Sequence, residues 1–260
     1  MVRSQAGSVA GRARQPIDRN GPAGYAAEFI GTAILVAAIG FVISNGAVAA
    51  PDFAALALLH VFVLMMLIAT LGGTSGAHFN PAVTVTLAAL RKIAWVEAGI
   101  YILMQLLGAV TGALLVKLLL DDEGSQVSYG GVASADIIGN SAGLAFVAEI
   151  LGTFLLMWAI MGMAVNPRGD RNFAPLVIAA TLGFAVLMIG PMTGAGLNPA
   201  RAFGPNLVGG TLDEPGGFLL AFVLGPLVGA LIAGFGYTAL VLRRDTAASG
   251  PGVRPIDKLE

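Results

Sequence analysis

The chain has 260 residues, of which 57% are hydrophobic and only 11% are charged, and its mean hydropathy is +0.84. Soluble domains carry roughly 25% charged residues, so this composition excludes an ordinary soluble domain and predicts a protein that crosses a membrane several times. The absence of cysteine excludes disulfides, a thiol nucleophile and a cysteine-ligated metal site. The net charge of −1 identifies no partner, and the useful signal is where the charges fall.

Long apolar runs alternate with short polar breaks along the chain. Residues 1–23 are polar and lack the apolar core of a signal peptide, so we expect a disordered cytoplasmic tail. Residues 243–260 are also polar and are expected to form a second cytoplasmic tail. Between them, six membrane spans are expected at residues 25–50, 53–71, 94–120, 143–165, 173–190 and 216–242, with a polar segment at 121–141 that separates two halves.

One tripeptide, Asn-Pro-Ala, occurs twice, at residues 80–82 and 198–200, and each copy follows a Gly-rich stretch. Asn at a helix N-cap followed by Pro at the first helical position is a helix-start signal. After each copy about ten apolar residues follow before a break, which at ~1.5 Å per residue is about half a membrane crossing. The two copies therefore predict half-helices that begin inside the membrane.

The two halves of the chain are related in sequence. Residues 27–32 (AEFIGT) and 148–153 (AEILGT) are separated by 121 positions, and the two tripeptides by 118. This internal repeat predicts a channel domain over residues 24–242, built from repeats at 24–120 and 143–242. Each repeat holds three spans, an odd number, so the second is inserted upside down. Inverted repeats with paired interrupted segments indicate a transport site at the midplane between them.

Lys and Arg predict the orientation of the spans. With a cytoplasmic N-terminus, 12 of the 14 lie on the cytoplasmic side, and the exceptions are Lys117 and Arg201. The opposite loops are acidic, so the positive-inside rule predicts a multi-pass protein of the plasma membrane with both termini in the cytoplasm. The first half-helix then enters from the cytoplasm and the second from outside, so their N-termini meet.

The paired Asn-Pro-Ala boxes, the repeated Ala-Glu-x-x-Gly-Thr motif and Arg201 directly after the second box resemble the aquaporin family, the major intrinsic proteins, over residues 24–242. The resemblance implies an all-α membrane fold of six transmembrane helices and two re-entrant half-helices around a pore. It also implies a homotetramer with one pore per subunit. Neither an enzymatic activity nor a cofactor or metal is expected, because the chain offers no nucleophile–base set and no metal cluster.

The boxes would form the centre of this pore. Each half-helix N-terminus carries roughly +0.5 of an elementary charge, and two of them at the midplane would oppose cations. Asn80 and Asn198 would cap their helices and point amide N–H groups into the pore, while a lone Asn-Pro would be no more than a good helix start. We expect the backbone before each box to run extended. The box residues are Asn80, Pro81, Ala82, Asn198, Pro199 and Ala200, and the expected ladder of carbonyl acceptors comprises Gly76, Ala77, His78, Gly194, Ala195 and Gly196.

Glu28 and Glu149 are acidic residues expected deep within the spans, one in each repeat. Acids inside a membrane commonly serve as proton relays or ion sites. The alternative is that each accepts hydrogen bonds from backbone N–H groups of the Gly-rich loop in its own repeat. Their symmetry favours this scaffold role, because a proton pathway needs no copy in each repeat. The His78 side chain is expected to brace its loop.

The family resemblance implies a selectivity filter at His60, Val186, Ala195 and Arg201. This set resembles a bacterial-type aquaporin with the filter of plant tonoplast intrinsic proteins, which pass water and often other small neutral solutes. Two alternatives stay open: His60 as a core histidine bonded within the bundle, and Arg201 as an interfacial anchor for phosphate. Ala202 stands where glycerol channels typically carry Asp, which argues against a dedicated glycerol channel.

The sequence therefore predicts a passive water channel in the lipid bilayer that excludes protons and ions and admits some small neutral solutes. The alternative is a facilitator chiefly for ammonia, urea, glycerol or hydrogen peroxide. A proton-coupled transporter that uses Glu28 and Glu149 is disfavoured by the two positive helix ends, and nothing indicates a nucleic-acid partner.

Overall fold

The computed structural model describes residues 21–46, 52–212 and 214–242, and these contain helices, turns and loops but no strand. Six helices are long and apolar enough to cross a membrane, which confirms the predicted fold class. Two half-helices lie among them, α3 (Pro81–Ala89) and α8 (Pro199–Val208). The six spans are α1 (Gly21–Ser44), α2 (Phe53–Ser75), α4 (Trp95–Leu119), α6 with η2 (Ala142–Val165), α7 (Ala174–Thr193) and the continuous run of α9, η3, α10 and η4 (Pro215–Leu242).

Four helix boundaries differ clearly from those expected. Helix α1 begins at Gly21, inside the expected tail, and ends at Ser44 rather than at residue 50. Helices α2 and α7 each run a few residues beyond their expected ends. Each ends only at a left-handed glycine, Gly76 or Gly194, whose N–H donates back into the last turn. The remainder of both expected tails, residues 1–20 and 243–260, lies outside the described residues.

The repeats pack alike. Helix α1 packs against α4 and its repeat partner α6 packs against α10, while α2 and α7 pack against each other. Gly108 of α4 lies against the backbone of α1, where an added Cβ would collide with the carbonyl of Phe29. Its counterpart Gly229, 121 positions later, lies in the same way against the carbonyl of Ile150 in α6. Small residues that let helix backbones approach closely are typical of membrane bundles.

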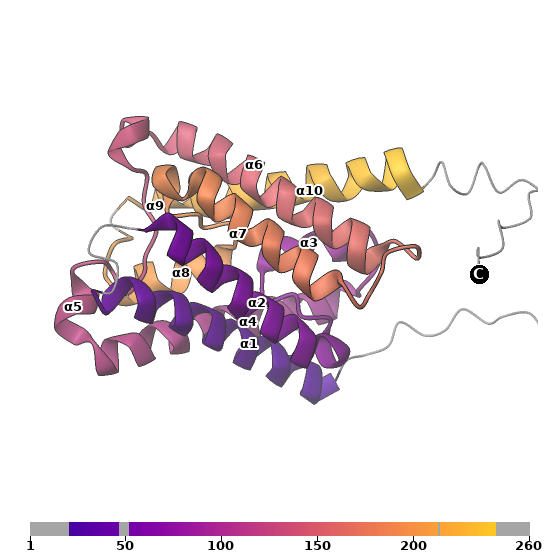
Figure 1. Ribbon diagram of the computed structural model, residues 1–260, viewed down its shortest axis with the longest axis horizontal. Coiled ribbons are helices and arrows are strands. Elements are labelled where there is room, and N and C mark those ends of the chain that lie inside the picture. Colours follow the sequence, from indigo (N-terminus) through magenta and orange to yellow (C-terminus); the bar gives the residue numbers. More distant parts are fainter. Residues whose placement is uncertain (1–20, 47–51, 213, 243–260) are drawn as a thin grey trace, which may run out of the picture.

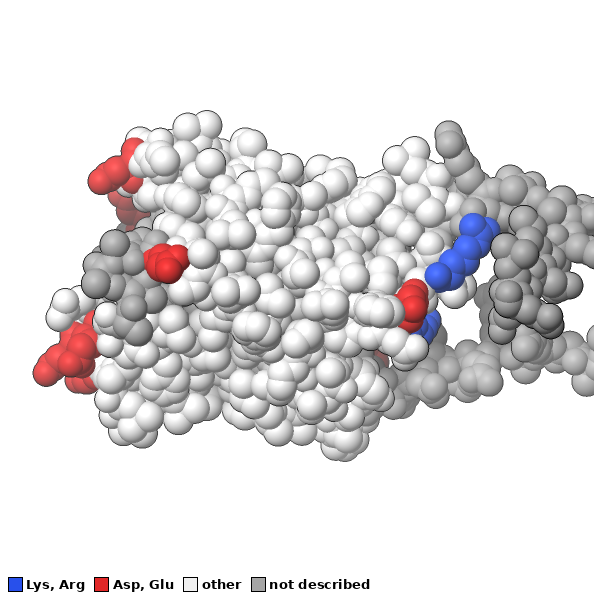
Figure 2. Space-filling view, viewed as in Figure 1, with Lys and Arg blue, Asp and Glu red and all other residues white. Residues whose placement is uncertain are grey.

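The half-helices enter from opposite ends of the bundle. Figure 1 shows α8 toward the end where α5 (Asp121–Ser125) and α9 (Pro215–Phe218) lie, and α3 toward the other end. Most of the acidic side chains visible in Figure 2 gather at the α5 end, whereas the visible Lys and Arg side chains lie at the opposite end beside a smaller acidic group. The short helix η1 (Asp136–Ile138) belongs to the segment between the repeats. Inversion of the second repeat therefore brings the two half-helix N-termini together within the bundle.

We predict that Gly108→Ala destabilises the protein by about 1–3 kcal/mol, because the new methyl group must push α4 away from α1. The measurement is thermal unfolding in detergent. Gly99→Ala in the same helix is the matched control, since a Cβ at Gly99 meets nothing within 4 Å. Equal unfolding temperatures for the two variants would contradict this account of the helix contact.

Candidate pore and selectivity filter

Each half-helix is started by its asparagine. The Asn80 side-chain oxygen accepts a hydrogen bond from the N–H of Ala82 at 2.9 Å, and Pro81 occupies the first helical position. In the second box, the Asn198 side-chain oxygen accepts from the N–H groups of Ala200 at 3.0 Å and Arg201 at 3.2 Å. Both asparagines therefore satisfy N–H groups that a helix start leaves without a partner.

The same two side chains also join the repeats. Asn80 Nδ2 donates to the carbonyl of Leu197 at 2.9 Å, and Asn198 Nδ2 donates to the carbonyl of Phe79 at 2.7 Å. A side-chain amide nitrogen carries two hydrogens, so one hydrogen of each asparagine is left over after this bond. Both asparagines line the main cavity of the protein.

The loops before the boxes are not simply extended, contrary to the sequence-based expectation. Several of their residues adopt a positive φ, and the pattern repeats at a spacing of 118 positions. Non-glycine residues in this region are uncommon and are held there by their surroundings. The positions are Gly76, Ala77 and Phe79 in the first loop and Gly194, Ala195 and Leu197 in the second.

Glu28 provides much of this restraint in the first loop, and its side chain is fully buried. One carboxylate oxygen accepts from the Ser75 hydroxyl at 2.7 Å and from the N–H of His78 at 3.0 Å. The other accepts from the N–H of Phe79 at 2.7 Å and from Gln105 Nε2 at 2.7 Å. Four donors thus surround one carboxylate, which compensates for its removal from water.

Glu149 does the same in the second repeat, and it is also fully buried. Its oxygens accept from the Thr193 hydroxyl at 2.6 Å, from the N–H of Gly196 at 2.8 Å and from the N–H of Leu197. The repeat counterpart of Gln105 is Pro226, which has no donor. The second carboxylate consequently has three donors where the first has four.

The glycine of each Ala-Glu-x-x-Gly-Thr motif makes room for the residue before the asparagine. A Cβ on Gly31 would collide with the ring of Phe79, and a Cβ on Gly152 would collide with the side chain of Leu197. Phe79 and Leu197 are each only 1% exposed. The motif therefore does two things to one loop residue: its carboxylate binds the backbone N–H, and its glycine leaves space for the side chain.

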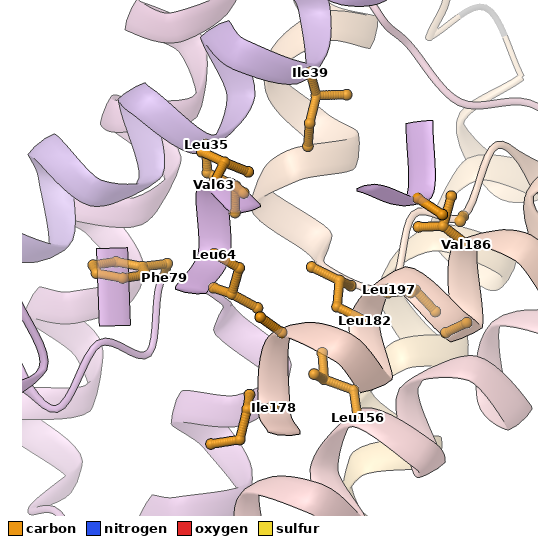
Figure 3. Packing of buried hydrophobic residues seen from close by; sticks show 14 of the residues in the cluster. Leu35, Ile39, Val63, Leu64, Phe79, Leu156, Ile178, Leu182, Val186 and Leu197 are labelled. Carbon is orange, nitrogen blue, oxygen red and sulfur yellow. The ribbon is translucent and has the colours of Figure 1, made fainter. Parts of the chain in front are cut away.

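A cavity of about 730 Å³ extends along the bundle, and a second of about 240 Å³ lies toward the α5 end. The first is called the inner cavity and the second the outer cavity. The larger is lined at one end by Lys92 and Arg171 and at the other by Arg201. Much of its wall is apolar, and Figure 3 shows how side chains from both halves converge there. These apolar lining residues include Leu35, Ile39, Leu64, Leu156, Ile178 and Leu182.

The predicted filter residues lie where the two cavities meet. His60 and Arg201 line both cavities, while Val186 lines the outer one and Ala195 the inner one. Gly194 also lines the outer cavity. The other predicted carbonyl residues, Gly76, Ala77, His78 and Gly196, line the inner cavity.

The polar side chains among these predicted filter residues are partly hydrogen-bonded. His60 Nδ1 lies 2.7 Å from the carbonyl of Leu56, and since a carbonyl only accepts, this nitrogen carries the hydrogen. His60 Nε2 is then an acceptor, and within the described part of the chain it has no partner. Arg201 Nη1 donates to the carbonyl of Gly130 at 2.9 Å, and its Nε is buried without a partner among the described residues. Arg201 is only 3% exposed, which argues against an interfacial anchor.

Comparison with known proteins identifies the family of the chain. A profile of the family described as Major intrinsic protein matches residues 23–237. The chain belongs to the major intrinsic protein family. It is 37% identical over 239 residues to a probable aquaporin AqpM of Archaeoglobus fulgidus, covering 83% of this chain and 96% of that one.

Two further relatives broaden the comparison. A glycerol uptake facilitator protein-like 6 of Lactiplantibacillus plantarum is 35% identical over 213 residues, covering 81% of this chain and 94% of its own. The solved aquaglyceroporin of Plasmodium falciparum has the same fold, with a TM-score of 0.67 at 24% identity, covering 86% of this chain and all of that one. This family of membrane channels thus holds relatives named for water and relatives named for glycerol.

The reasoning from sequence missed two parts of this family's site in the present chain. Phe79 and Leu197 join the two loops through their carbonyls, and the only signal was an apolar residue immediately before each asparagine. The segment between the repeats was expected only to separate them, yet the carbonyl of Gly130 accepts a hydrogen bond from Arg201. Its Gly130-Gly131 pair was the available sign that the backbone approaches something closely.

His78 lines the cavity and also contacts its own half-helix, α3. Its Nδ1 lies 3.1 Å from the hydroxyl of Thr84, and its ring lies edge-on to that of Tyr101 with centroids 5.3 Å apart. Thr84 also accepts from Gln105 at 2.9 Å. The imidazole is therefore restrained on two sides at the edge of the cavity.

We predict that Glu149→Gln lowers the stability of the protein by about 2–3 kcal/mol, because a side-chain NH₂ would face buried N–H groups that need an acceptor. Thermal unfolding in detergent measures the loss. Glu123→Gln on the exposed face of α5 is the control and should leave the unfolding temperature unchanged. A wild-type unfolding temperature for Glu149→Gln would contradict the role given to this carboxylate.

Proposed function

We propose that this protein is a passive water channel that excludes protons and ions and that admits some small neutral solutes. The observation that carries this proposal is the junction of the two boxes. There, each asparagine donates one amide hydrogen to a carbonyl of the opposite loop, and its second amide hydrogen stays available beside the cavity. A water molecule at this junction would accept from both asparagines.

Such a water would have its own hydrogens turned away along the pore, which interrupts a continuous proton wire. The two half-helix N-termini add roughly +0.5 of an elementary charge each at the same place. A cation that has already lost part of its hydration shell would be repelled there. The carbonyls of the two Gly-rich loops would supply acceptors on either side of the junction.

A proton relay through the glutamates has little support. Both carboxylates are fully buried, and every carboxylate oxygen accepts at least one hydrogen bond from its loop or a neighbouring helix. We assign Glu28 and Glu149 the scaffold role, in which they aim the loop carbonyls.

The composition of the proposed filter supports passage of small neutral solutes besides water. His60 offers an acceptor at Nε2, and Arg201 offers N–H donors and a positive charge. Val186 and Ala195 are apolar and small, and both are buried, 2% exposed each. This combination resembles the tonoplast type of filter, with one polar side and one apolar side.

The remaining parts of the proposal concern the setting of the channel. We place it in the plasma membrane with both termini cytoplasmic, because Lys92 and Arg171 lie at one end of the pore and the acidic loops lie at the other. The channel domain spans residues 24–242, and assembly as a homotetramer follows the family.

We predict that proteoliposomes containing the protein shrink faster in an osmotic gradient than empty liposomes, as measured by stopped-flow light scattering. An internal pH dye should show no faster proton entry than in empty liposomes, because the box junction opposes proton transfer. Water permeability equal to that of empty liposomes would refute the proposal.

The alternative function is transport chiefly of a small neutral solute such as ammonia, urea, glycerol or hydrogen peroxide. The small apolar side chains Val186 and Ala195 favour it, as does the similarity to a relative named for glycerol uptake. The two candidates differ in the ratio of solute flux to water flux.

We predict that His60→Phe lowers urea and glycerol flux about tenfold while water flux persists, because the larger ring removes an acceptor and narrows the opening. Uptake assays beside stopped-flow measurements test this. Leu103→Phe on the exposed side of α4 is the control. Unchanged solute flux in His60→Phe would show that this filter assignment is wrong.

A further inference from the structure

The guanidinium of Arg201 is held by a part of the chain that belongs to neither box. Its Nη1 donates to the carbonyl of Gly130, which lies between the two repeats. The residues around this carbonyl form an unusual turn, because Ser128, Tyr129 and Gly130 all have positive φ. A turn of this kind needs other restraints to keep Gly130 in place.

The turn has backbone hydrogen bonds of its own, such as that from the Tyr129 N–H to the Gly124 carbonyl at 2.8 Å, and Asn206 adds a restraint from α8. Its side-chain oxygen accepts from the N–H of Val132 at 2.9 Å, and its Nδ2 donates to the carbonyl of Val132 at 2.9 Å. The side chain thus pairs with both backbone polar groups of one residue. Asn206 is 2% exposed and stands one and a half turns after Arg201 in α8. One half-helix therefore carries both the filter arginine and the side chain that holds the arginine's partner segment.

The segment held in this way also forms a wall of the pore. Val127 and Gly131 line the outer cavity together with His60 and Arg201. Val132 lies close to the second Gly-rich loop, since a Cβ on Gly194 would meet it at 3.4 Å. Displacement of this segment would widen the outer cavity beside the filter and release Arg201 at the same time.

We propose that Asn206 is a positioning residue that sets the effective width of the filter, through residues 130–132 and Arg201. This inference rests on the proposed channel function and names a determinant of its selectivity. Asn206 itself touches neither the permeating molecule nor the boxes. Its effect is to keep Gly130 where Arg201 can donate to it, so that the guanidinium stays on one side of the opening.

The test compares Asn206→Asp and Asn206→Ala with the wild type in proteoliposomes, by the ratio of urea permeability to water permeability. Asn206→Asp loses the bond to the Val132 carbonyl, and Asn206→Ala loses both bonds to Val132. The ratio should rise about fivefold in Asn206→Asp, as expected for the loss of about one buried hydrogen bond, and at least as far in Asn206→Ala. A merely structural role would reduce the number of folded channels and lower both permeabilities together, leaving the ratio unchanged. An unchanged ratio in a folded variant would overturn the proposal.

Thr211→Val is the matched control. It removes the 3.0 Å bond from Asn206 Nδ2 to the Thr211 hydroxyl and the 3.4 Å bond from that hydroxyl to the Asn206 carbonyl, and it leaves the pairing with Val132 intact. This variant should keep the wild-type ratio, and a ratio raised as far as in Asn206→Asp would count against the proposal. If Asn206→Ala does not fold, Asn206→Asp decides the matter, because it keeps the side-chain volume and the acceptor for the Val132 N–H.

A second measurement separates this inference from the proposed function. The chain has no cysteine, so Val127→Cys introduces a single thiol at the wall of the outer cavity. A membrane-impermeant maleimide should label it faster when Asn206→Asp is also present. Equal labelling rates would overturn the role of Asn206 whether or not the wild type conducts water, whereas absent water flux with faster labelling would refute the channel proposal alone.

Discussion

The two carboxylates that bind the Gly-rich loops are the interaction on which the pore depends. Non-helical backbone at membrane depth has no water to satisfy its N–H groups, and each unsatisfied group costs several kcal/mol. Glu28 and Glu149 accept from two backbone N–H groups each, in loops whose left-handed residues cannot bond in a helix. These two carboxylates therefore supply the acceptors that allow the loops to depart from helical geometry inside the bundle.

The residues that surround the two carboxylates differ between the repeats. In the first, Gln105, Thr84 and His78 form a polar group beside Glu28. In the second, their counterparts are Pro226, Ala202 and Gly196, and the ring of Phe222 lies where a side chain on Gly196 would be. The second carboxylate therefore has fewer polar neighbours than the first, and more of its surroundings are apolar. Arg201 has no counterpart in the first repeat, where Val83 occupies the matching position.

Much of the architecture was predictable because it follows from local signals. Composition and apolar run length predicted the six spans, and Asn followed by Pro predicted both helix starts. The Ala-Glu-x-x-Gly-Thr motifs are 121 positions apart and the Asn-Pro-Ala boxes 118, and these similar spacings predicted the repeat. The odd number of spans in each repeat predicted its inversion. These signals are read along the chain, within one helix or between two copies of one pattern, so a single sequence contains them.

The unpredicted features depend on contacts between distant segments. The bond from Asn206 to Val132 joins residues 74 positions apart, and that from Arg201 to Gly130 joins residues 71 apart. Nothing in the local sequence distinguishes Asn206 from a polar residue that faces solvent. The left-handed loop residues were also missed, because Ala77, Ala195 and Leu197 carry no glycine signature and are held there by their partners. The roles of the filter residues remain predictions.

The reciprocal bonds between the boxes have a consequence for how the protein forms. Asn80 is synthesised and inserted long before Leu197 exists, and its partner lies 117 residues further along the chain. During translation the first half-helix therefore has its capping bond but lacks its cross-repeat bond. Neither repeat contains a finished pore centre by itself. The junction can be completed only after the second repeat has docked, which makes closure of the pore a late step of maturation.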